Sequence, residues 1–306
     1  MPTTDFSQSN QFLSSSQPLQ LIADPYAETA VSEPEPEPLR LSIQPAAEET
    51  DAMPRLERYT MQSAILPDAR EVAVYLPTAY AREPERRFPV FYLHDGQNLF
   101  DGRKSYMAGH TWRAGETADR ETSANSIEPI ILVGIANAGL HRLDEYTPTR
   151  DAKMGGGEGS RYGRLLIEEL KPFIDKHYRT RPQPSETALG GSSLGGLISL
   201  YLGFTRPDIF GRLAILSPSI WWNQRSILPL LAETATKPEL KIWLDIGTAE
   251  GSRHVRDTDR LHRLLLERGW KDEVDLRYRR YPNAVHNEDA WADRFDEVLQ
   301  FLFPRL

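Results

Sequence analysis

The stretch Gly190-Gly191-Ser192-Ser193-Leu194-Gly195-Gly196 decides the fold of this chain. Before it, the run 187–189 is typical of a buried strand end, and after it residues 194–205 follow a helical pattern. The stretch contains Gly-x-Ser-x-Gly, in which a serine at a sharp strand-to-helix turn is strained and requires small neighbours. A glycine- and serine-rich turn without chemistry is the alternative. We interpret Ser193 as the apex of a strand–turn–helix unit and the candidate nucleophile, because Ser192 would lie one residue off the apex.

Strand-like and helix-like segments alternate on both sides of this turn. Short runs of apolar and β-branched residues predict strands at 72–76, 88–94, 130–135, 187–191, 213–216, 240–246 and 275–281. Amphipathic patterns predict helices at 162–177, 197–205, 258–268 and 288–302. The alternation predicts an α/β fold, with a mostly parallel central sheet and helices on both faces. Ligands of such folds bind beyond the carboxyl ends of the strands, so we expect the catalytic residues in those loops.

The amino-terminal segment differs from the rest of the chain. It is rich in Ser, Gln, Glu and Pro, and Arg40 is its only basic residue before Arg55. Such a composition offers too little apolar surface to offset the entropy of ordering. We therefore expect residues 1–52 to form a disordered acidic tail and residues 53–306 to form the catalytic domain.

Composition excludes several kinds of function. The chain has no cysteine, which removes disulfides, thiolate metal sites and a cysteine nucleophile. Its formal net charge of −8 argues against a nucleic-acid partner. We find neither a signal-peptide pattern nor an apolar run of the roughly 18 residues that a membrane span needs. A cytoplasmic protein without a membrane partner is expected, and its oligomeric state stays open, a homodimer included.

A serine nucleophile needs a base, and three histidines follow Ser193. His262 lies within a helical pattern and is expected at the surface, whereas His254 follows a predicted strand and is a possible substrate contact. His286 lies between the last predicted strand and the last predicted helix. That position matches the order Ser, then acid, then His that serine hydrolases with this turn follow. We expect His286 to be the base.

The acid should lie between the nucleophile and the base, on a loop after a strand. Glu250 follows the strand at 240–246 on a glycine-flanked loop and could orient the imidazole. Asp245 is the second candidate, but it lies within the strand. Asp257 is the third. We expect Glu250, and the sequence leaves the choice among these carboxylates open.

Acyl transfer also requires hydrogen-bond donors for a developing oxyanion. One donor should be the backbone N–H of Leu194, directly after the nucleophile, and the other should come from the loop after the strand at 88–94. In that loop Gly96 allows the backbone to turn back, so the N–H of Gln97 or of Gly96 is the candidate. His94 and Asp95 could pass for part of a second triad or for a metal pair, but they lie in one early turn without a third ligand, so we expect them to hold the loop by hydrogen bonds. No metal and no cofactor is expected.

With these residues placed, the chain resembles the esterase D and enterochelin-esterase-like group of α/β-hydrolases, which includes feruloyl and acetylxylan esterases. The resemblance covers residues 58–304 and rests on the segments 92–100, 145–148, 168–175, 190–196, 217–219 and 286–288. It implies the α/β-hydrolase fold, Ser193 and His286 as nucleophile and base, and an oxyanion donor at Gln97. Some members of this group resemble Ser–His dyads, in which no acid assists the histidine. This resemblance leaves the role of Glu250 open. Leu194 and the absence of cysteine set the chain apart from the branch that acts on S-formylglutathione.

The substrate is expected to be a small carboxylic ester, on a carbohydrate, a hydroxycinnamate or a siderophore lactone. Trp221 and Trp222 follow a strand and could form a stacking wall, or they could cap the core instead. Asp95 and Arg142 are the charged candidates for substrate binding. Arg150 could likewise pair with an acidic substrate, and salt bridges from Arg142 and Arg150 to Asp144 or Asp151 are the alternative. Acyl transfer at the same site and a catalytically inactive binding module are the rival functions.

Overall fold

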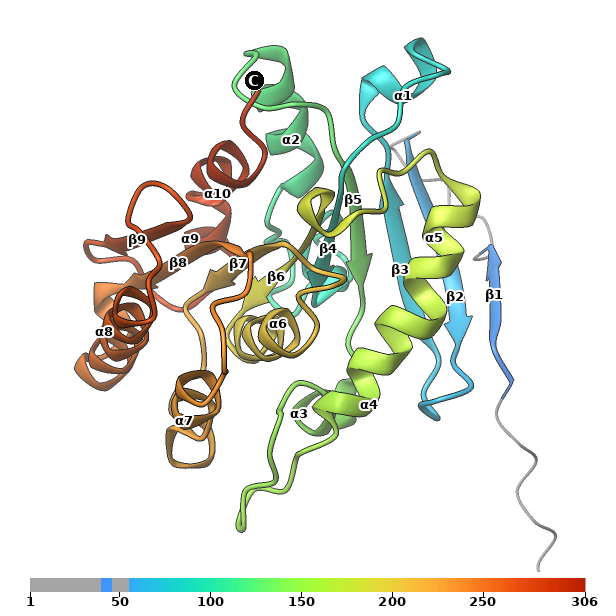
Figure 1. Ribbon diagram of the computed structural model, residues 1–306. Coiled ribbons are helices and arrows are strands. Elements are labelled where there is room, and N and C mark those ends of the chain that lie inside the picture. The colour runs from blue at the N-terminus through green and yellow to red at the C-terminus, as the bar shows by residue number, and fades with distance from the viewer. Residues whose placement is uncertain (1–39, 46–54, 306) are drawn as a thin grey trace, which may run out of the picture. The chain divides into compact units, whose positions relative to one another are not determined.

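The computed structural model describes residues 40–45 and 55–305, and these contain a nine-stranded sheet (Figure 1). The strand order across the sheet is β1-β2-β3-β5-β4-β6-β7-β8-β9. The strands are β1 (Ser42–Pro45), β2 (Leu56–Gln62), β3 (Arg70–Tyr75), β4 (Val90–His94), β5 (Ile131–Ile135), β6 (Thr187–Ser192), β7 (Arg212–Leu216), β8 (Lys241–Gly247) and β9 (Leu276–Tyr281).

Six neighbouring strands run parallel, namely β5, β4, β6, β7, β8 and β9. At the β5 edge the sheet continues with β3, β2 and β1, each antiparallel to its neighbour. This confirms the mostly parallel sheet, and all seven predicted strands are present. The sequence missed β2, in which charged residues interrupt the apolar pattern. It also missed β1, which lies inside the segment 1–52 that was predicted to be a disordered tail. The prediction is wrong for Ser42–Pro45, because backbone pairing with β2 orders this strand without a large apolar surface. The other residues of 1–52 lie outside the described residues.

Helices cover both faces of the sheet (Figure 1). They are α1 (Thr78–Arg82), α2 (Ala114–Ser123), α3 (Arg142–Glu145), α4 (Gly159–Arg164), α5 (Lys171–His177), α6 (Leu194–Thr205), α7 (Ile227–Ala232), α8 (Ser252–Glu267), α9 (Glu288–Ala292) and α10 (Phe295–Leu302). None of the helices in the described part of the chain is long and apolar enough to cross a lipid bilayer.

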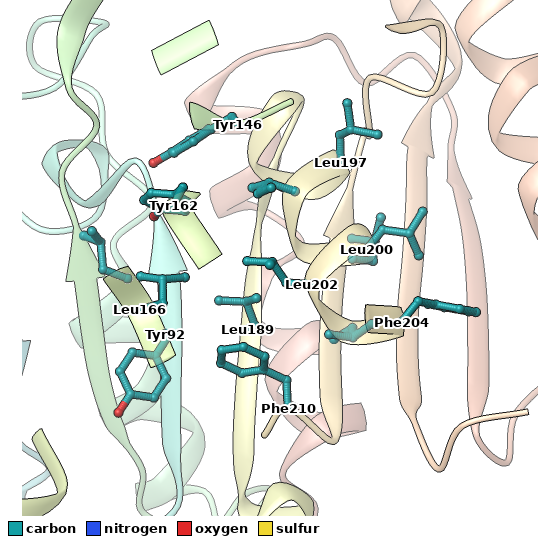
Figure 2. Close-up of a cluster of buried hydrophobic side chains, with 14 of the residues drawn as sticks. Tyr92, Tyr146, Tyr162, Leu166, Leu189, Leu197, Leu200, Leu202, Phe204 and Phe210 are labelled. Atoms are coloured by element: carbon teal, nitrogen blue, oxygen red, sulfur yellow. The ribbon is translucent and has the colours of Figure 1, made fainter. Parts of the chain in front are cut away.

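Alternate side chains of the central strands pack into two separate cores. Along β4, Tyr92 joins the core beneath α6, α7 and α8, whereas Phe91 and Leu93 join the core beneath α2 and α10. Figure 2 shows the first core, in which Leu202 of α6 lies beside Leu189 of β6. Both faces of β4 are therefore buried, which explains its nearly continuous apolar sequence.

Two predicted helices are interrupted in the structure. The helix expected at 162–177 consists of α4, a π-helical segment at Leu165–Leu170, and α5. The helix expected at 288–302 is divided into α9 and α10 at Arg294, whose φ of −122° is not helical. The Arg294 side chain is 1% exposed, forms a salt bridge with Asp245 of β8 and donates a hydrogen bond to Ser217, which follows β7. We infer that the break turns this guanidinium inward.

A buried polar cluster supports the carboxyl end of β4. Arg70 pairs with Glu145 through two hydrogen bonds of 2.7 and 2.9 Å, and both side chains are buried. Beside this pair, the Tyr162 hydroxyl meets His94 Nδ1 at 2.9 Å, and the Tyr146 ring lies 5.2 Å from the His94 ring. Burial lowers the pKa of His94 to about 3, so the ring is neutral in the folded protein at neutral pH.

The buried His94 should make stability depend on pH. An unfolded-state histidine binds a proton near its ordinary pKa of 6.5, but the folded one stays neutral down to about 3. The unfolded state therefore binds more protons in this window, and stability falls as the pH falls below 6.5. Between pH 6.5 and about pH 5 this group should cost about 2 kcal/mol of unfolding free energy. Urea titrations at several pH values measure the free energy of unfolding. This free energy should fall less steeply on acidification in His94→Gln than in wild type.

His177→Gln is the matched control, because His177 is exposed on α5. This variant should keep the wild-type dependence on pH. If His94→Gln lost as much stability on acidification as wild type, His94 would not be the group responsible.

Candidate active site

Ser193 occupies the turn between β6 and α6, with a φ of 59° and a ψ of −119°. Positive φ is unfavourable for a residue with a side chain and is concentrated at functional sites. Two hydrogen bonds hold the turn, from the Ser193 N–H to the Leu216 carbonyl and from the Ser219 N–H to the Ser193 carbonyl, both 3.0 Å long. The strand–turn–helix unit expected from the sequence is present, with Ser193 at its apex.

The glycines around Ser193 allow the turn to approach β4 closely. A Cβ placed at Gly191 would lie 3.1 Å from the Cβ of His94, and one at Gly195 would lie 3.2 Å from the same atom. Larger residues at these positions would push β4 away from the turn. This is the steric requirement that the Gly-x-Ser-x-Gly pattern expresses.

His286 and Glu250 form the second part of the site. His286 Nδ1 lies 2.7 Å from Glu250 Oε2, which assigns the proton to Nδ1 and leaves Nε2 as a proton acceptor. The Glu250 side chain is fully buried, whereas the His286 side chain is 39% exposed. Burial alone would raise the pKa of Glu250, but hydrogen bonds from His286 and Ser217 lower it below its usual value. Glu250 is therefore an ionised carboxylate at neutral pH.

Behind Glu250 lies a buried network that fixes its other oxygen. Glu250 Oε1 accepts hydrogen bonds from Ser217 Oγ at 2.6 Å and from the Gly247 N–H at 2.8 Å. Ser217 Oγ in turn accepts from Trp291 Nε1 at 3.0 Å and from Arg294 Nη2 at 2.7 Å. The carboxylate cannot rotate without breaking several of these bonds.

Asp245, the second candidate for the acid, belongs to this network and does not contact His286. Its Oδ1 pairs with Arg294 Nη2 at 2.9 Å, and its Oδ2 accepts from Trp243 Nε1 at 2.8 Å. Burial raises the pKa of Asp245, and Arg294 opposes that rise. Asp245 therefore holds Arg294 in place. Asp257, the third candidate, pairs with Arg225 at 2.6 Å instead.

Ser193 and His286 line one pocket of about 370 Å³. Ser193 Oγ lies 3.2 Å from Ser219 Oγ, and among the described residues it makes no hydrogen bond with the His286 ring. Hydrogen bonds between nucleophile and base are often long before substrate binds. His286 packs edge-on against Trp291, with ring centroids 4.9 Å apart, and this contact restricts its ring.

The loop after β4 forms the opposite wall of the pocket. It begins with Asp95 at a φ of 55° and continues as a short 3₁₀ turn, Gly96–Asn98. A Cβ at Gly96 would lie 2.5 Å from the backbone of Gly134, so only glycine allows this loop to pack on β5. Gln97 lines the pocket, and its Oε1 accepts from the Asn137 N–H at 3.2 Å.

Leu194 is the first residue of α6, so its N–H has no acceptor within the helix. Gln97 lines the same pocket as Ser193, Gly96 precedes Gln97 in the loop after β4, and Leu194 directly follows Ser193. Their role as oxyanion donors stays a prediction.

Asp95 and Arg142 pair with each other at the rim of the pocket. Arg142 donates from Nε at 2.7 Å and from Nη2 at 2.8 Å to the two Asp95 oxygens, and Asn137 Nδ2 adds a third bond at 2.7 Å. Burial opposes ionisation of Asp95, but Arg142 holds its pKa below the usual value. The sequence alternative, in which Arg142 pairs with Asp144 or Asp151, is wrong.

Trp222 does not lie in the pocket. Its indole is buried, and Nε1 donates to the Thr149 carbonyl at 2.8 Å, so it belongs to the core. Trp221 packs beside it at 6.0 Å and is likewise absent from the pocket lining. Of the two alternatives that the sequence left open for these tryptophans, the structure favours packing against the core over a stacking wall in the pocket. Asp245, Asp257 and His262 also lie outside the pocket lining.

Sequence reasoning missed several residues that line the pocket, namely Asn98, Met107, Asn137, Ser192, Glu288 and Trp291. Asn98 links two walls, because its Nδ2 donates to Glu288 Oε1 at 3.2 Å and its Oδ1 accepts from the Tyr106 N–H at 2.9 Å. Asn137 lies just beyond the carboxyl end of β5, a position that could have identified it. Across the described residues, no group of three or more His, Asp or Glu side chains is arranged to hold a metal ion.

Comparisons with known proteins identify the family of this chain. The profile of a family described as putative esterase matches residues 63–302. The chain is 27% identical over 249 residues to the uncharacterized protein YbbA of Bacillus subtilis, covering 76% of this chain and 92% of YbbA. It is 29% identical over 178 residues to ferri-bacillibactin esterase BesA of the same organism, covering 52% of this chain and 57% of BesA.

Among solved structures, the BES protein of Bacillus cereus matches with a TM-score of 0.67 at 23% identity, covering 84% of this chain and 98% of that protein. This likeness concerns the fold, and together with the strand order it confirms the α/β-hydrolase fold. The family profile spans most of the chain and includes Ser193, Glu250 and His286. The chain therefore belongs to the putative esterase family of α/β-hydrolases and is a carboxylic ester hydrolase.

Proposed function

We propose that the chain is a serine esterase that works through an acyl-enzyme formed on Ser193. The observation that carries the proposal is the buried, ionised Glu250 at 2.7 Å from Nδ1 of a histidine that shares a pocket with the strained Ser193. His286 Nε2 takes the Ser193 proton as Oγ attacks the ester carbonyl. The tetrahedral oxyanion accepts hydrogen bonds from the N–H of Leu194 and from that of Gln97 or Gly96. Collapse expels the alcohol, which leaves with the proton from His286.

Deacylation repeats these steps with water as the nucleophile. The His286 side chain is 39% exposed, so water can reach the base from solvent. This access favours hydrolysis over transfer of the acyl group to another alcohol. An inactive binding module is disfavoured, because such a module has no need of an ionised Glu250 fixed against the imidazole.

Ser193→Ala should nearly abolish hydrolysis of p-nitrophenyl acetate, because it removes the hydroxyl that we propose carries the acyl group. We expect kcat/KM to fall by at least about 10³-fold, as is usual when a nucleophile of this kind is removed. Release of p-nitrophenol measures the rate. Ser192→Ala is the matched variant and should retain most of the activity. An active Ser193→Ala would contradict the assignment. An inactive Ser192→Ala in the same experiment would then identify Ser192 as the nucleophile.

Glu250→Gln should lower kcat by about 10²- to 10⁴-fold, because an amide can hold the wrong tautomer of His286 and cannot stabilise the imidazolium. The p-nitrophenyl acetate assay measures the effect. Asp257→Asn removes a buried carboxylate elsewhere and should leave kcat near wild type. A near-normal rate for Glu250→Gln would mean that Ser193 and His286 work without this acid.

For the substrate, we infer an ester with a bulky apolar or aromatic acyl group, a siderophore ester being the first choice. The identity with ferri-bacillibactin esterase BesA supports it. The pocket has a volume of about 370 Å³ and would hold one part of such a molecule, while the rest would extend over the surface beside it. Tyr106 lines the pocket and is 87% exposed. Two further exposed apolar residues are close in sequence to pocket residues, Leu140 at 97% exposure and Val285 at 45%. They would cover the part that projects from the pocket.

Tyr106→Ala should weaken the binding of a bulky aryl ester and leave the binding of a small ester unchanged. Stacking by one aromatic ring contributes about 0.5–1.5 kcal/mol, so KM for a catecholate trilactone or a feruloyl ester should rise about two- to tenfold. KM for p-nitrophenyl acetate should stay unchanged, because Tyr106 is held in the site through its backbone N–H. Acetylated xylan oligomers complete the screen. Preference for them over both aryl esters would exclude the proposed substrate class.

A further inference from the structure

Two adjoining clefts lie at the amino ends of β7 and β8. Their volumes are about 440 and 700 Å³, and both are lined by Arg212 and Lys241, the first residues of these strands. In a parallel sheet the amino ends lie at the edge opposite the carboxyl ends, where Ser193 and the other candidate catalytic residues lie. These clefts are therefore separate from the candidate active site, and the esterase mechanism makes no use of them.

The smaller cleft carries an excess of positive charge, although the whole chain has a net charge of −8. Its lining contains two carboxylates against five cationic side chains, Arg86, Arg181, Arg212, Lys241 and Arg305. Both carboxylates are already shared. Arg181 pairs with Glu128 and also with Glu186 at 3.0 Å, and Arg212 Nη2 is 3.5 Å from Glu186.

Arg212 and Lys241 keep hydrogen-bonding capacity that the protein does not use. Arg212 Nη1 is buried and has no hydrogen-bond partner in the structure. Lys241 has no carboxylate partner among the described residues. Each cation lies over an aromatic ring instead, Arg212 over Phe303 at 4.9 Å and Lys241 over Phe301 at 4.7 Å. A buried donor such as Arg212 Nη1 is costly unless a ligand or solvent satisfies it.

Strand pairing brings the two like charges together. Arg212 and Lys241 are direct partners in the register of β7 and β8, and Arg277 of β9 lies over the same Phe301 ring as Lys241. Burial lowers the pKa of Lys241, and the charges of Arg212 and Arg277 lower it further. Among the described residues, cationic side chains therefore outnumber carboxylates in this cleft, and a bound anion would offset the excess positive charge.

We propose that this cleft, which we call the distal cleft, is a binding site for a phosphate-type dianion centred on Arg212 and Lys241. A tetrahedral oxyanion offers acceptors in several directions, and it can meet a guanidinium and an ammonium that approach from neighbouring strands. A carboxylate such as acetate carries a single negative charge and only two acceptor oxygens, so it should bind the two cations more weakly. Free phosphate and a phosphomonoester share this chemistry.

Isothermal titration calorimetry of the full chain with sodium phosphate, at constant ionic strength, tests the site. We expect saturable binding by phosphate and none by acetate. Lys241→Met should weaken phosphate binding at least tenfold, and Arg212→Gln should do the same. Lys176→Met is the matched control, because Lys176 is an exposed lysine on α5 outside both clefts, and it should bind like wild type.

Thermal unfolding separates loss of the site from loss of the fold. Phosphate should raise the Tm of wild type and of Lys176→Met, but not that of Lys241→Met. Hydrolysis of p-nitrophenyl acetate by Lys241→Met should stay at the wild-type rate, which would show that the variant is folded. Phosphate should not compete with the ester. A titration with glucose 6-phosphate shows whether an esterified phosphate also fits.

Equal phosphate affinity in wild type and in both cleft variants would place the anion elsewhere and overturn the proposal. Absence of any saturable binding to wild type would overturn it as well.

Discussion

The candidate site depends on one buried carboxylate that is bound from two sides. Glu250 presents Oε2 to His286 at 2.7 Å and Oε1 to Ser217 at 2.6 Å, and its side chain is fully shielded from solvent. Desolvation of an isolated carboxylate would drive it to the neutral form. Hydrogen bonds to both oxygens reverse this, so the group stays ionised where an imidazolium would form. The same bonds fix the direction in which the carboxylate points, and hence the orientation of the imidazole.

Ser217 connects this carboxylate to the rest of the fold. It follows β7, it accepts from Trp291 of α9, and it accepts from Arg294 between α9 and α10. Arg294 is also bound to Asp245 within β8. Removal of one partner from such a buried ionic network commonly costs about 3–5 kcal/mol, because the remaining charge stays buried. The packing of α9 and α10 on the sheet and the position of Glu250 are therefore parts of a single arrangement.

Local pattern was sufficient to predict the strands of the central sheet and the residues that lie at their carboxyl ends. Ser193, Glu250 and His286 were each recognisable because each follows a strand, and because a parallel sheet brings such positions to one edge. Contacts that depend on side-chain direction were not predictable in this way. Nothing in the spacing of Asp95 and Arg142 signals their pairing, and Trp222 could equally have faced the pocket or the core. β1 is too short to show an apolar pattern, and its order depends on backbone pairing with β2 and on Ile43, which packs against the core.

The break between α9 and α10 shows why sequence periodicity has limits near a site. Residues 288–302 carry the pattern of one continuous helix, and an uninterrupted helix would satisfy the backbone better than two short ones. An uninterrupted helix would also fix the direction of the residue-294 side chain by its helical phase alone. The non-helical φ of −122° at Arg294 frees this side chain from that phase, and its guanidinium reaches Ser217 at 2.7 Å and Asp245 at 2.9 Å. The local cost in helical hydrogen bonds is thus offset by the network that holds Glu250, an interaction between distant segments that no local pattern contains.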